Sequence, residues 1–299
     1  MHEIRLAHLP FQRLVGPRAN LRASLGCLIA LSALSVATTY SAPDKSAYTL
    51  FNPTPRDQMR ELSTDRPDQT ESPYTVDAGH WQIELDFFNY TYDREAGVRT
   101  EMWNVAPVNV KLGLTNTTDL QAIFDSYATE RVRSAGATTT TRDWGDLTLR
   151  LKQNLWGNDG GDTALALMPF VKLPLNTGDA GNNLVEGGLI VPLAISLPAG
   201  WGMGLMTEVD WLADATGNDR HAEWVNTVTF SHDLTKRLGG YVEFVSVHSE
   251  ERGARWIAQA DAGLTYAISD DIQLDGGCNV GVTESAPDLQ PFLGLSLRY

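Results

Sequence analysis

The densest group of charged residues in this chain lies within positions 65–71. It consists of Asp65, Arg66, Asp68 and Glu71. One arginine among three carboxylates can form ion pairs with a facing surface, so the group could act as a plug or gate that docks on opposite charges. Alternatively, the two aspartates accept hydrogen bonds from backbone N–H groups and only fix a turn around the intervening proline. The sequence leaves both interpretations open.

A second set of charged residues alternates with apolar residues. In the stretch 79–94, Gln82, Glu84 and Asp86 share one face, and Trp81 lies on the opposite, apolar face. The charged residues expected to face inward on this pattern are Glu84, Asp86, Lys111, Asp125, Arg150, Lys152, Lys172, Glu208, Asp210, Glu243, Asp261, Asp275 and Arg298. They could select solutes by charge in a pore, or pair with one another and fill the interior.

The elements that must position these residues are strands. From Gly79 onward the chain alternates between strands and turns, without an amphipathic helix. Most strands exceed the roughly 9 to 11 residues that cross a bilayer at a tilt. The predicted strands are 79–94, 101–115, 119–132, 143–156, 163–176, 184–197, 201–213, 221–233, 238–250, 255–268, 271–283 and 288–299.

The connections between these strands fall into two length classes. Tight turns at "TNTTD", "GNDGGD", "LPAGW", "DLTKR" and "SDD" alternate with longer connections, among them "DREAGVRTE" and "ERVRSAGATTTTRD". Short periplasmic turns and longer outer loops are typical of outer-membrane barrels. A soluble sandwich would also alternate, but its outer face would be the polar one. The sequence therefore predicts an all-β fold, a transmembrane antiparallel up-and-down β-barrel of about 12 strands over residues 79–299.

The region before the barrel has two parts. Residues 1–42 resemble a signal peptide, with an arginine-rich start, an apolar run and a cleavage site between positions 37 and 42. Residues 43–78 are rich in Pro, Asp and Thr and are expected to form a periplasmic segment. Within it, Thr54 could cap a short helix that ends near Leu62. Whether this segment enters the barrel is left open.

The composition and the C-terminal residues indicate which partners the protein could bind. A formal net charge of −14 argues against nucleic-acid binding. The apolar face of the last predicted strand runs to Tyr299, the terminal aromatic residue that the outer-membrane insertion machinery is expected to recognise. The expected partners are thus outer-membrane lipids, the insertion machinery and a small-molecule solute.

Residues that could support catalysis or metal binding are sparse. Ser231 and His232 are neighbours on one strand and point to opposite faces, while Ser246 and His248 share a face without an evident third group. Cysteine pairs and closely spaced histidine pairs are absent from the sequence. We therefore predict no enzyme, no cofactor and no metal site.

The stretch from Ser63 to Tyr90, "STDRPDQTESPYTVDAGHWQIELDFFNY", resembles the outer-membrane "MetA-pathway of phenol degradation" family. The resemblance rests on a Thr-Asp-Arg-Pro-Asp segment, a following Thr-Glu-Ser-Pro, and a glycine that leads into a strand with Gln82 and Glu84. It extends over roughly 63–299 and implies a transporter-like barrel linked to aromatic catabolism. No functional residue is established for the family, so none is carried over.

Together these observations predict a channel in the bacterial outer membrane for passive uptake of small, aromatic or apolar solutes. One alternative is a structural or adhesive barrel with a closed lumen, whose loops carry the function. A less favoured alternative is a lipid-modifying outer-membrane enzyme.

Overall fold

The computed structural model describes residues 44–175, 183–215 and 219–299. The predicted signal peptide and its cleavage site lie outside these ranges. The described chain forms one 15-stranded antiparallel sheet. Its strands are β1 (Trp81–Glu95), β2 (Val98–Val105), β3 (Val108–Thr115), β4 (Thr118–Phe124), β5 (Tyr127–Ser134), β6 (Ala137–Trp144), β7 (Leu147–Trp156), β8 (Thr163–Leu173), β9 (Glu186–Ser196), β10 (Trp201–Ala213), β11 (Arg220–Asp233), β12 (Leu238–Ser249), β13 (Ile257–Ser269), β14 (Ile272–Gly281) and β15 (Leu289–Arg298).

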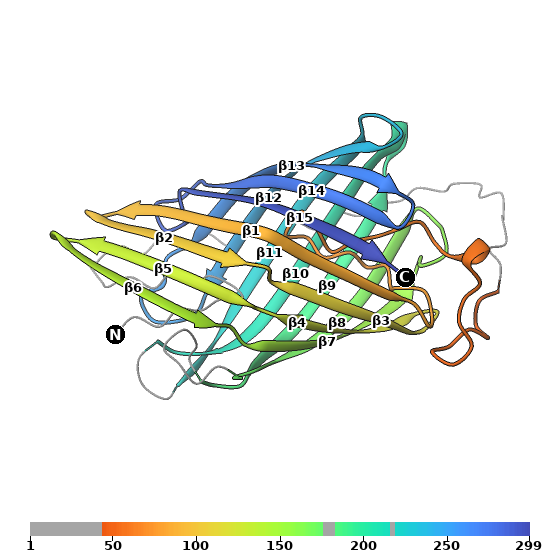
Figure 1. Ribbon diagram of the computed structural model, residues 1–299, viewed down its shortest axis with the longest axis horizontal. Coiled ribbons are helices and arrows are strands. Elements are labelled where there is room, and N and C mark those ends of the chain that lie inside the picture. The colour runs from red at the N-terminus through yellow and green to blue at the C-terminus, as the bar shows by residue number, and fades with distance from the viewer. Residues whose placement is uncertain (1–43, 176–182, 216–218) are drawn as a thin grey trace, which may run out of the picture.

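The sheet closes into a barrel because β15 pairs with β1. The closed ring contains 12 strands in the order β1-β3-β4-β7, followed by β8 to β15. Trp81 and Tyr299 complete the closure, since each donates its backbone N–H to the other's carbonyl. Figure 1 shows β1 with β15 on one side and β2 and β3 on the other. The predicted 12-stranded antiparallel barrel is confirmed.

Three of the predicted strands are divided. The stretches 101–115, 119–132 and 143–156 each break into two strands, at Ala106, near Asp125 and at Gly145. Ala106 adopts a positive φ of 55°. At Gly145, a Cβ atom would lie 2.2 Å from the Cβ of Asp125, so the crossing of the two breaks requires glycine. The apolar face changes phase across the first break, from Trp103 and Val105 to Val110 and Leu112, and the prediction of a single strand overlooked this change.

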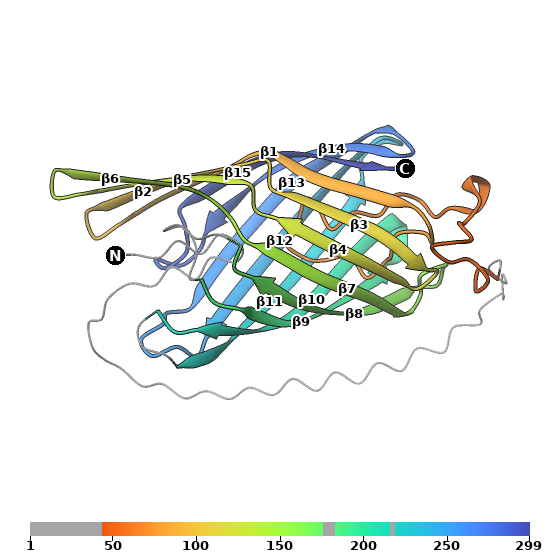
Figure 2. The ribbon, with the colours of Figure 1, turned by 60° about the horizontal axis from the view of Figure 1, so that its bottom comes forward.

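The outer halves of the divided strands form a flange. β2, β5 and β6 extend the sheet from β1 and project beyond the barrel (Figure 2). Two predicted long loops, "DREAGVRTE" and "ERVRSAGATTTTRD", are therefore wrong. They are tight hairpins, with positive φ at Ala96 and Gly97 in one and at Ala135 and Gly136 in the other. Successive positive φ values match the twist of the flanking strands in two-residue hairpins.

The barrel surface is apolar outside and polar inside. In β12, Val242 is 55 % exposed, whereas the inward Glu243 and Val245 are 5 % and 1 % exposed. All eight tryptophans are exposed, and several lie at strand ends, as Trp81, Trp156 and Trp201 do. An apolar exterior with aromatic residues near its edges is the surface of a membrane-spanning barrel. Among the described residues, no helix is long and apolar enough to cross a membrane.

The helix predicted from Thr54 to Leu62 is wrong. Only one 3₁₀ turn forms, η1 (Arg56–Gln58), and no side chain caps it. Beyond this turn the backbone N–H of Arg60 donates to Asp77 Oδ2 at 3.0 Å. The hydrogen bond from the Arg60 N–H to Asp77 takes the place of the backbone hydrogen bond that a helix would supply. The segment therefore continues in an extended conformation into the barrel.

Candidate functional site

The interior of the barrel is occupied by residues 63–75, which we call the lumen segment. Its central residue is Asp65, which lies between two lysines of the barrel wall. Asp65 forms an ion pair with Lys111 of β3, and its Oδ1 atom lies 2.6 Å from Lys152 Nζ of β7. Lys111 also pairs with Glu84 of β1, whose carboxylate accepts the Asp65 backbone N–H. Four buried charges thus alternate in sign.

Arg66 extends this network around the wall through β1 to β14. Its Nη2 atom lies 2.6 Å from Asp86 Oδ1 of β1 and 2.7 Å from Asp275 Oδ1 of β14. A Cβ atom at Gly294 would lie 2.1 Å from Arg66 Nη2. The guanidinium therefore occupies space that only a glycine in β15 leaves free. The expected role of Arg66 as an ion-pair partner of wall carboxylates fits this geometry.

The next residues of the lumen segment contact β11 to β13. The backbone N–H of Gln69 donates to Glu243 Oε2 at 2.8 Å, and the Gln69 side chain donates to Asp261 Oδ2 at 2.7 Å. Thr70 donates to Glu243 and shares a hydrogen bond with Thr227. Two wall carboxylates are therefore satisfied by neutral groups rather than by cations.

Glu71 is held between a charge and an apolar surface. Its carboxylate pairs with Arg150 of β7, whose guanidinium lies 5.8 Å from the ring centroid of Phe170. The Glu71 backbone N–H contacts the Sδ atom of Met206 at 3.4 Å. This places the end of the charged motif directly against the inner face of β10.

An apolar band lies on the wall at this point. It consists of five inward-facing side chains from β8 to β12, packed together and buried, with two half-buried neighbours. The members are Met168, Ile190, Met206, Val225 and Val245, with Phe170 and Val247 against them. In a mostly polar lumen, this band is an apolar region of the inner wall, and the lumen segment contacts its Met206 edge.

A further charge cluster fixes the chain where it enters the barrel. Asp77 faces Lys45 at 3.7 Å, Arg60 at 3.4 Å and Arg298 at 3.9 Å. Arg298 also donates to the Arg60 carbonyl at 2.7 Å. Sequence reasoning selected only Arg298 of this group. Asp77 could not be selected, because it lies outside any alternating strand.

Other inward-facing residues were also missed. Asp119 and Gln121 are fully buried in β4, and Asp119 Oδ2 accepts the Val76 backbone N–H at 3.0 Å. Asp119 and Gln121 alternate with the apolar Leu120, which is the same pattern that selected Lys111. Only charged residues in the clearest strands were considered as candidates. Including every polar residue on the inward face of each strand would have selected Asp119 and Gln121 as well.

The remaining predicted lumen residues lie elsewhere on the wall. Lys172 pairs with Glu186 at 2.7 Å near the barrel end opposite the C-terminus. Glu208 and Asp210 face inward on β10. Asp125 is half-buried in the break between β4 and β5 instead of on a strand face, so its predicted place on the lining face is corrected.

The turn interpretation of the charged motif also finds contacts. Asp65 Oδ1 accepts the Ser72 backbone N–H at 3.0 Å, and Thr64 donates to the Arg66 carbonyl at 2.6 Å. Asp65 therefore bridges its own segment and the wall with one carboxylate. The fixed turn and the docked plug are compatible in this geometry rather than exclusive.

Burial and neighbouring charge act in opposite directions on the acids of the lumen segment. Burial alone would raise the pKa of Asp65, but Lys111 and Lys152 outweigh it and hold that pKa below its usual range. Burial and the nearby Glu243 raise the pKa of Asp68 to about 8. Burial also raises the pKa of Glu71 to about 7, although Arg150 opposes this effect.

These directions predict that docking of the lumen segment weakens as pH rises. Asp65 favours the docked state above its ordinary pKa of 3.8. Asp68 and Glu71 bind protons more tightly when docked, so docking loses free energy as pH rises toward their docked pKa values of about 8 and 7. We expect higher single-channel current at pH 8 than at pH 5.

The matched control is Asp68→Asn, which removes one titrating group and keeps the shape of the side chain. We expect this variant to show a smaller increase in current between pH 5 and pH 8. A current that does not change with pH, or that changes equally in both proteins, would contradict the assignment of this pH dependence to Asp68.

The fold and its filled polar lumen define a β-barrel of the bacterial outer membrane. The family described as "Putative MetA-pathway of phenol degradation" matches residues 64–299, and the chain belongs to it. The resemblance noted in the sequence is thereby confirmed. No curated protein sequence matched this chain.

One solved structure supports the same fold, and a second aligns more weakly. The COG4313 outer membrane channel from Pseudomonas putida F1 aligns with a TM-score of 0.57 at 14 % identity, over 79 % of this chain and 100 % of that one. The CymD monoaromatic hydrocarbon channel aligns with a TM-score of 0.43 at 8 % identity, over 73 % of this chain and 87 % of that one. At 14 % identity, the alignment with the COG4313 channel supports the barrel fold alone.

Proposed function

We propose that this protein is an outer-membrane channel for passive uptake of small aromatic solutes, with the lumen segment as its plug. The observation that carries the proposal is the apolar band of β8 to β12 inside a barrel whose other inward groups are mostly polar. A wall of methionines and branched residues suits flat apolar groups of varied shape, because methionine side chains are flexible and polarizable. The family's link to phenol degradation supports the same solute class.

The charges of the lumen set the second part of the proposal. Acidic residues outnumber basic ones among the predicted lumen residues, so neutral solutes and cations should pass more easily than anions. Passage requires the lumen segment to move, since it covers the Met206 edge of the apolar band and joins β3 to β14 through Asp65 and Arg66. No energy source is part of this proposal.

A comparison of phenyl β-glucoside with methyl β-glucoside tests the solute preference. Both solutes are neutral and cross lipid bilayers poorly, and they differ only in the aromatic ring. In proteoliposome swelling at pH 8, we expect phenyl β-glucoside to enter faster although it is larger. Faster entry of methyl β-glucoside would contradict the aromatic preference while leaving a channel in place.

Met206→Ser serves as the matched variant, because it makes the apolar band more polar and leaves the ion pairs of Asp65 and Arg66 unchanged. We expect the advantage of phenyl β-glucoside to shrink in this variant. An unchanged ratio of the two rates would show that the apolar band does not select the solute.

A second candidate function is structural or adhesive. The flange of β2, β5 and β6 favours it, because these strands project beyond the barrel (Figure 2). Most side chains of β6 and half of those of β5 are exposed. Solute entry that is unaffected by removal of the lumen segment, together with phenotypes confined to deletion of the flange, would favour this candidate.

The lipid-modifying enzyme is less favoured. Ser246 accepts a hydrogen bond from the Trp256 indole at 2.9 Å, and His232 contacts the Ala199 carbonyl at 3.1 Å. Neither contact prepares a serine nucleophile by a histidine base.

A further inference from the structure

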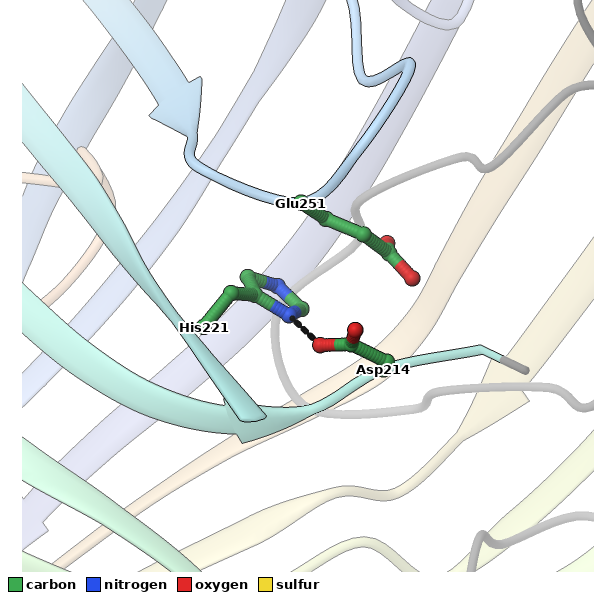
Figure 3. Close-up of side chains that lie close together, drawn as sticks. All are labelled: Asp214, His221 and Glu251. Carbon is green, nitrogen blue, oxygen red and sulfur yellow. Dashed lines mark hydrogen bonds and ion pairs between the residues drawn. The ribbon is translucent and has the colours of Figure 1, made fainter. Parts of the chain in front are cut away.

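Three side chains converge at the barrel end opposite the C-terminus. Asp214 directly follows β10, His221 is the second residue of β11, and Glu251 lies in the connection between β12 and β13. One ligand atom from each residue lies within 4.8 Å of the other two. Figure 3 shows the two carboxylates and the imidazole gathered around a common space.

The backbone holds all three residues in place. His221 pairs with Leu212 across the β10–β11 ladder. The Glu251 Oε1 atom accepts the Ala215 backbone N–H at 2.7 Å, and a turn closes behind Glu251 where Ala254 donates to its carbonyl. The convergence therefore follows from strand register and a hydrogen-bonded turn, not from free side-chain rotation.

The polar atoms of this cluster are incompletely satisfied. His221 Nδ1 lies 2.8 Å from Asp214 Oδ1, which uses one ring nitrogen. Within the part of the chain that the structure describes, His221 Nε2 and Glu251 Oε2 are buried and have no hydrogen-bond partner. The His221 side chain is 5 % exposed. A buried donor or acceptor without a partner costs free energy, and a bound ligand would remove that cost.

We propose that Asp214, His221 and Glu251 form a binding site for a divalent transition-metal ion, with Zn²⁺ as the best match. One imidazole nitrogen and two carboxylate oxygens are a ligand set that zinc accepts in four-coordinate sites with an added water. Two carboxylates balance the charge of the ion. The ion would link the connection after β10 to the connection after β12 and fix two loops at this rim.

The basic residue that precedes His221 is directed elsewhere. Arg220 donates to the Val185 carbonyl at 2.8 Å and lies 3.5 Å from the Trp211 carbonyl. It is therefore engaged with the backbone of neighbouring strands and does not supply the positive charge for this cluster. This inference is independent of the proposed channel function, since the cluster makes no contact with the lumen segment in the described structure.

Isothermal titration of Zn²⁺ into the refolded chain from residue 43, stripped with a chelator, tests the proposal. We expect one saturable site. Loss of a ligand should weaken binding by at least about 10- to 100-fold, the range found when only the outer-shell groups that orient a ligand are removed. His221→Ala and Glu251→Gln should both show this loss, and His248→Ala, at an exposed histidine of β12, should bind like the unmodified chain.

Folding of each variant is checked by the change in gel mobility on heating. If His221→Ala does not fold, Asp214→Asn replaces it, with the same expected weakening. Absence of saturable binding by the folded, unmodified chain would overturn the proposal. Equal binding by the unmodified chain and the folded His221 and Glu251 variants, or loss of binding in His248→Ala, would overturn it as well.

Discussion

Lys111→Met is expected to lower the free energy of unfolding by about 3–5 kcal/mol, the range for removal of one partner from a buried ion pair. Lys111 is 2 % exposed and is shared by Asp65 and Glu84. Methionine keeps most of the apolar stem and removes the ammonium group, with its charge and its hydrogen bonds. The carboxylates of Asp65 and Glu84 would then face each other, and the ion pair of Asp65 with Lys152 at 2.6 Å would remain.

Urea unfolding in lipid vesicles, followed by tryptophan fluorescence, measures this loss. Lys236→Met is the matched control, because Lys236 is exposed in the turn between β11 and β12, and we expect it to change stability little. Adding Glu84→Gln to Lys111→Met should recover part of the loss, since it removes the carboxylate whose ion-pair partner was Lys111, whereas Asp65 still pairs with Lys152. Equal stability of the Lys111 and Lys236 variants would show that the network does not hold the folded state.

The barrel itself could be predicted from the sequence because its signal is local. A period of two residues assigns each side chain to a face without knowledge of its neighbours. This is why the strand count was correct, and why Lys111, Arg150 and Asp275 could be expected on the inward face. The position of the charged motif before the first strand also marked residues 65–71 as a unit.

The pairing of those residues could not be predicted. Asp65 meets Lys152 across 87 positions of sequence, and Arg66 meets Asp275 across 209. Such contacts depend on how deep the lumen segment enters the barrel, which no periodicity encodes. The flange was missed for a different reason. Polar, threonine-rich stretches such as 137–142 were expected to be loops, whereas pairing with β5 makes them a strand.

The largest functional effect is expected from removal of residues 43–72. A barrel of 12 strands falls between those that side chains fill, near 8 strands, and those that leave an open channel, near 16. Without the lumen segment, the wall residues Lys111, Lys152 and Asp275 would face water, so we expect an open pore. Because acidic residues outnumber basic ones among the predicted lumen residues, this pore should prefer cations. The barrel ladder remains intact, because β1 and β15 close it without these residues.

The matched control begins at Pro53. It removes the first part of the N-terminal segment, including the Lys45 contact with Asp159 at 3.0 Å, and retains the lumen segment. We expect this shorter deletion to leave conductance unchanged. It thereby separates loss of the plug from loss of contacts at the barrel end.

The most direct test is single-channel conductance in a planar bilayer, measured on the refolded chains that begin at residue 43, Pro53 and Pro73. If the lumen segment is a plug, the chains from residue 43 and Pro53 will show the same small steps or none. The chain from Pro73 will then show steps several-fold larger. Equal conductance in all three folded proteins would contradict the account.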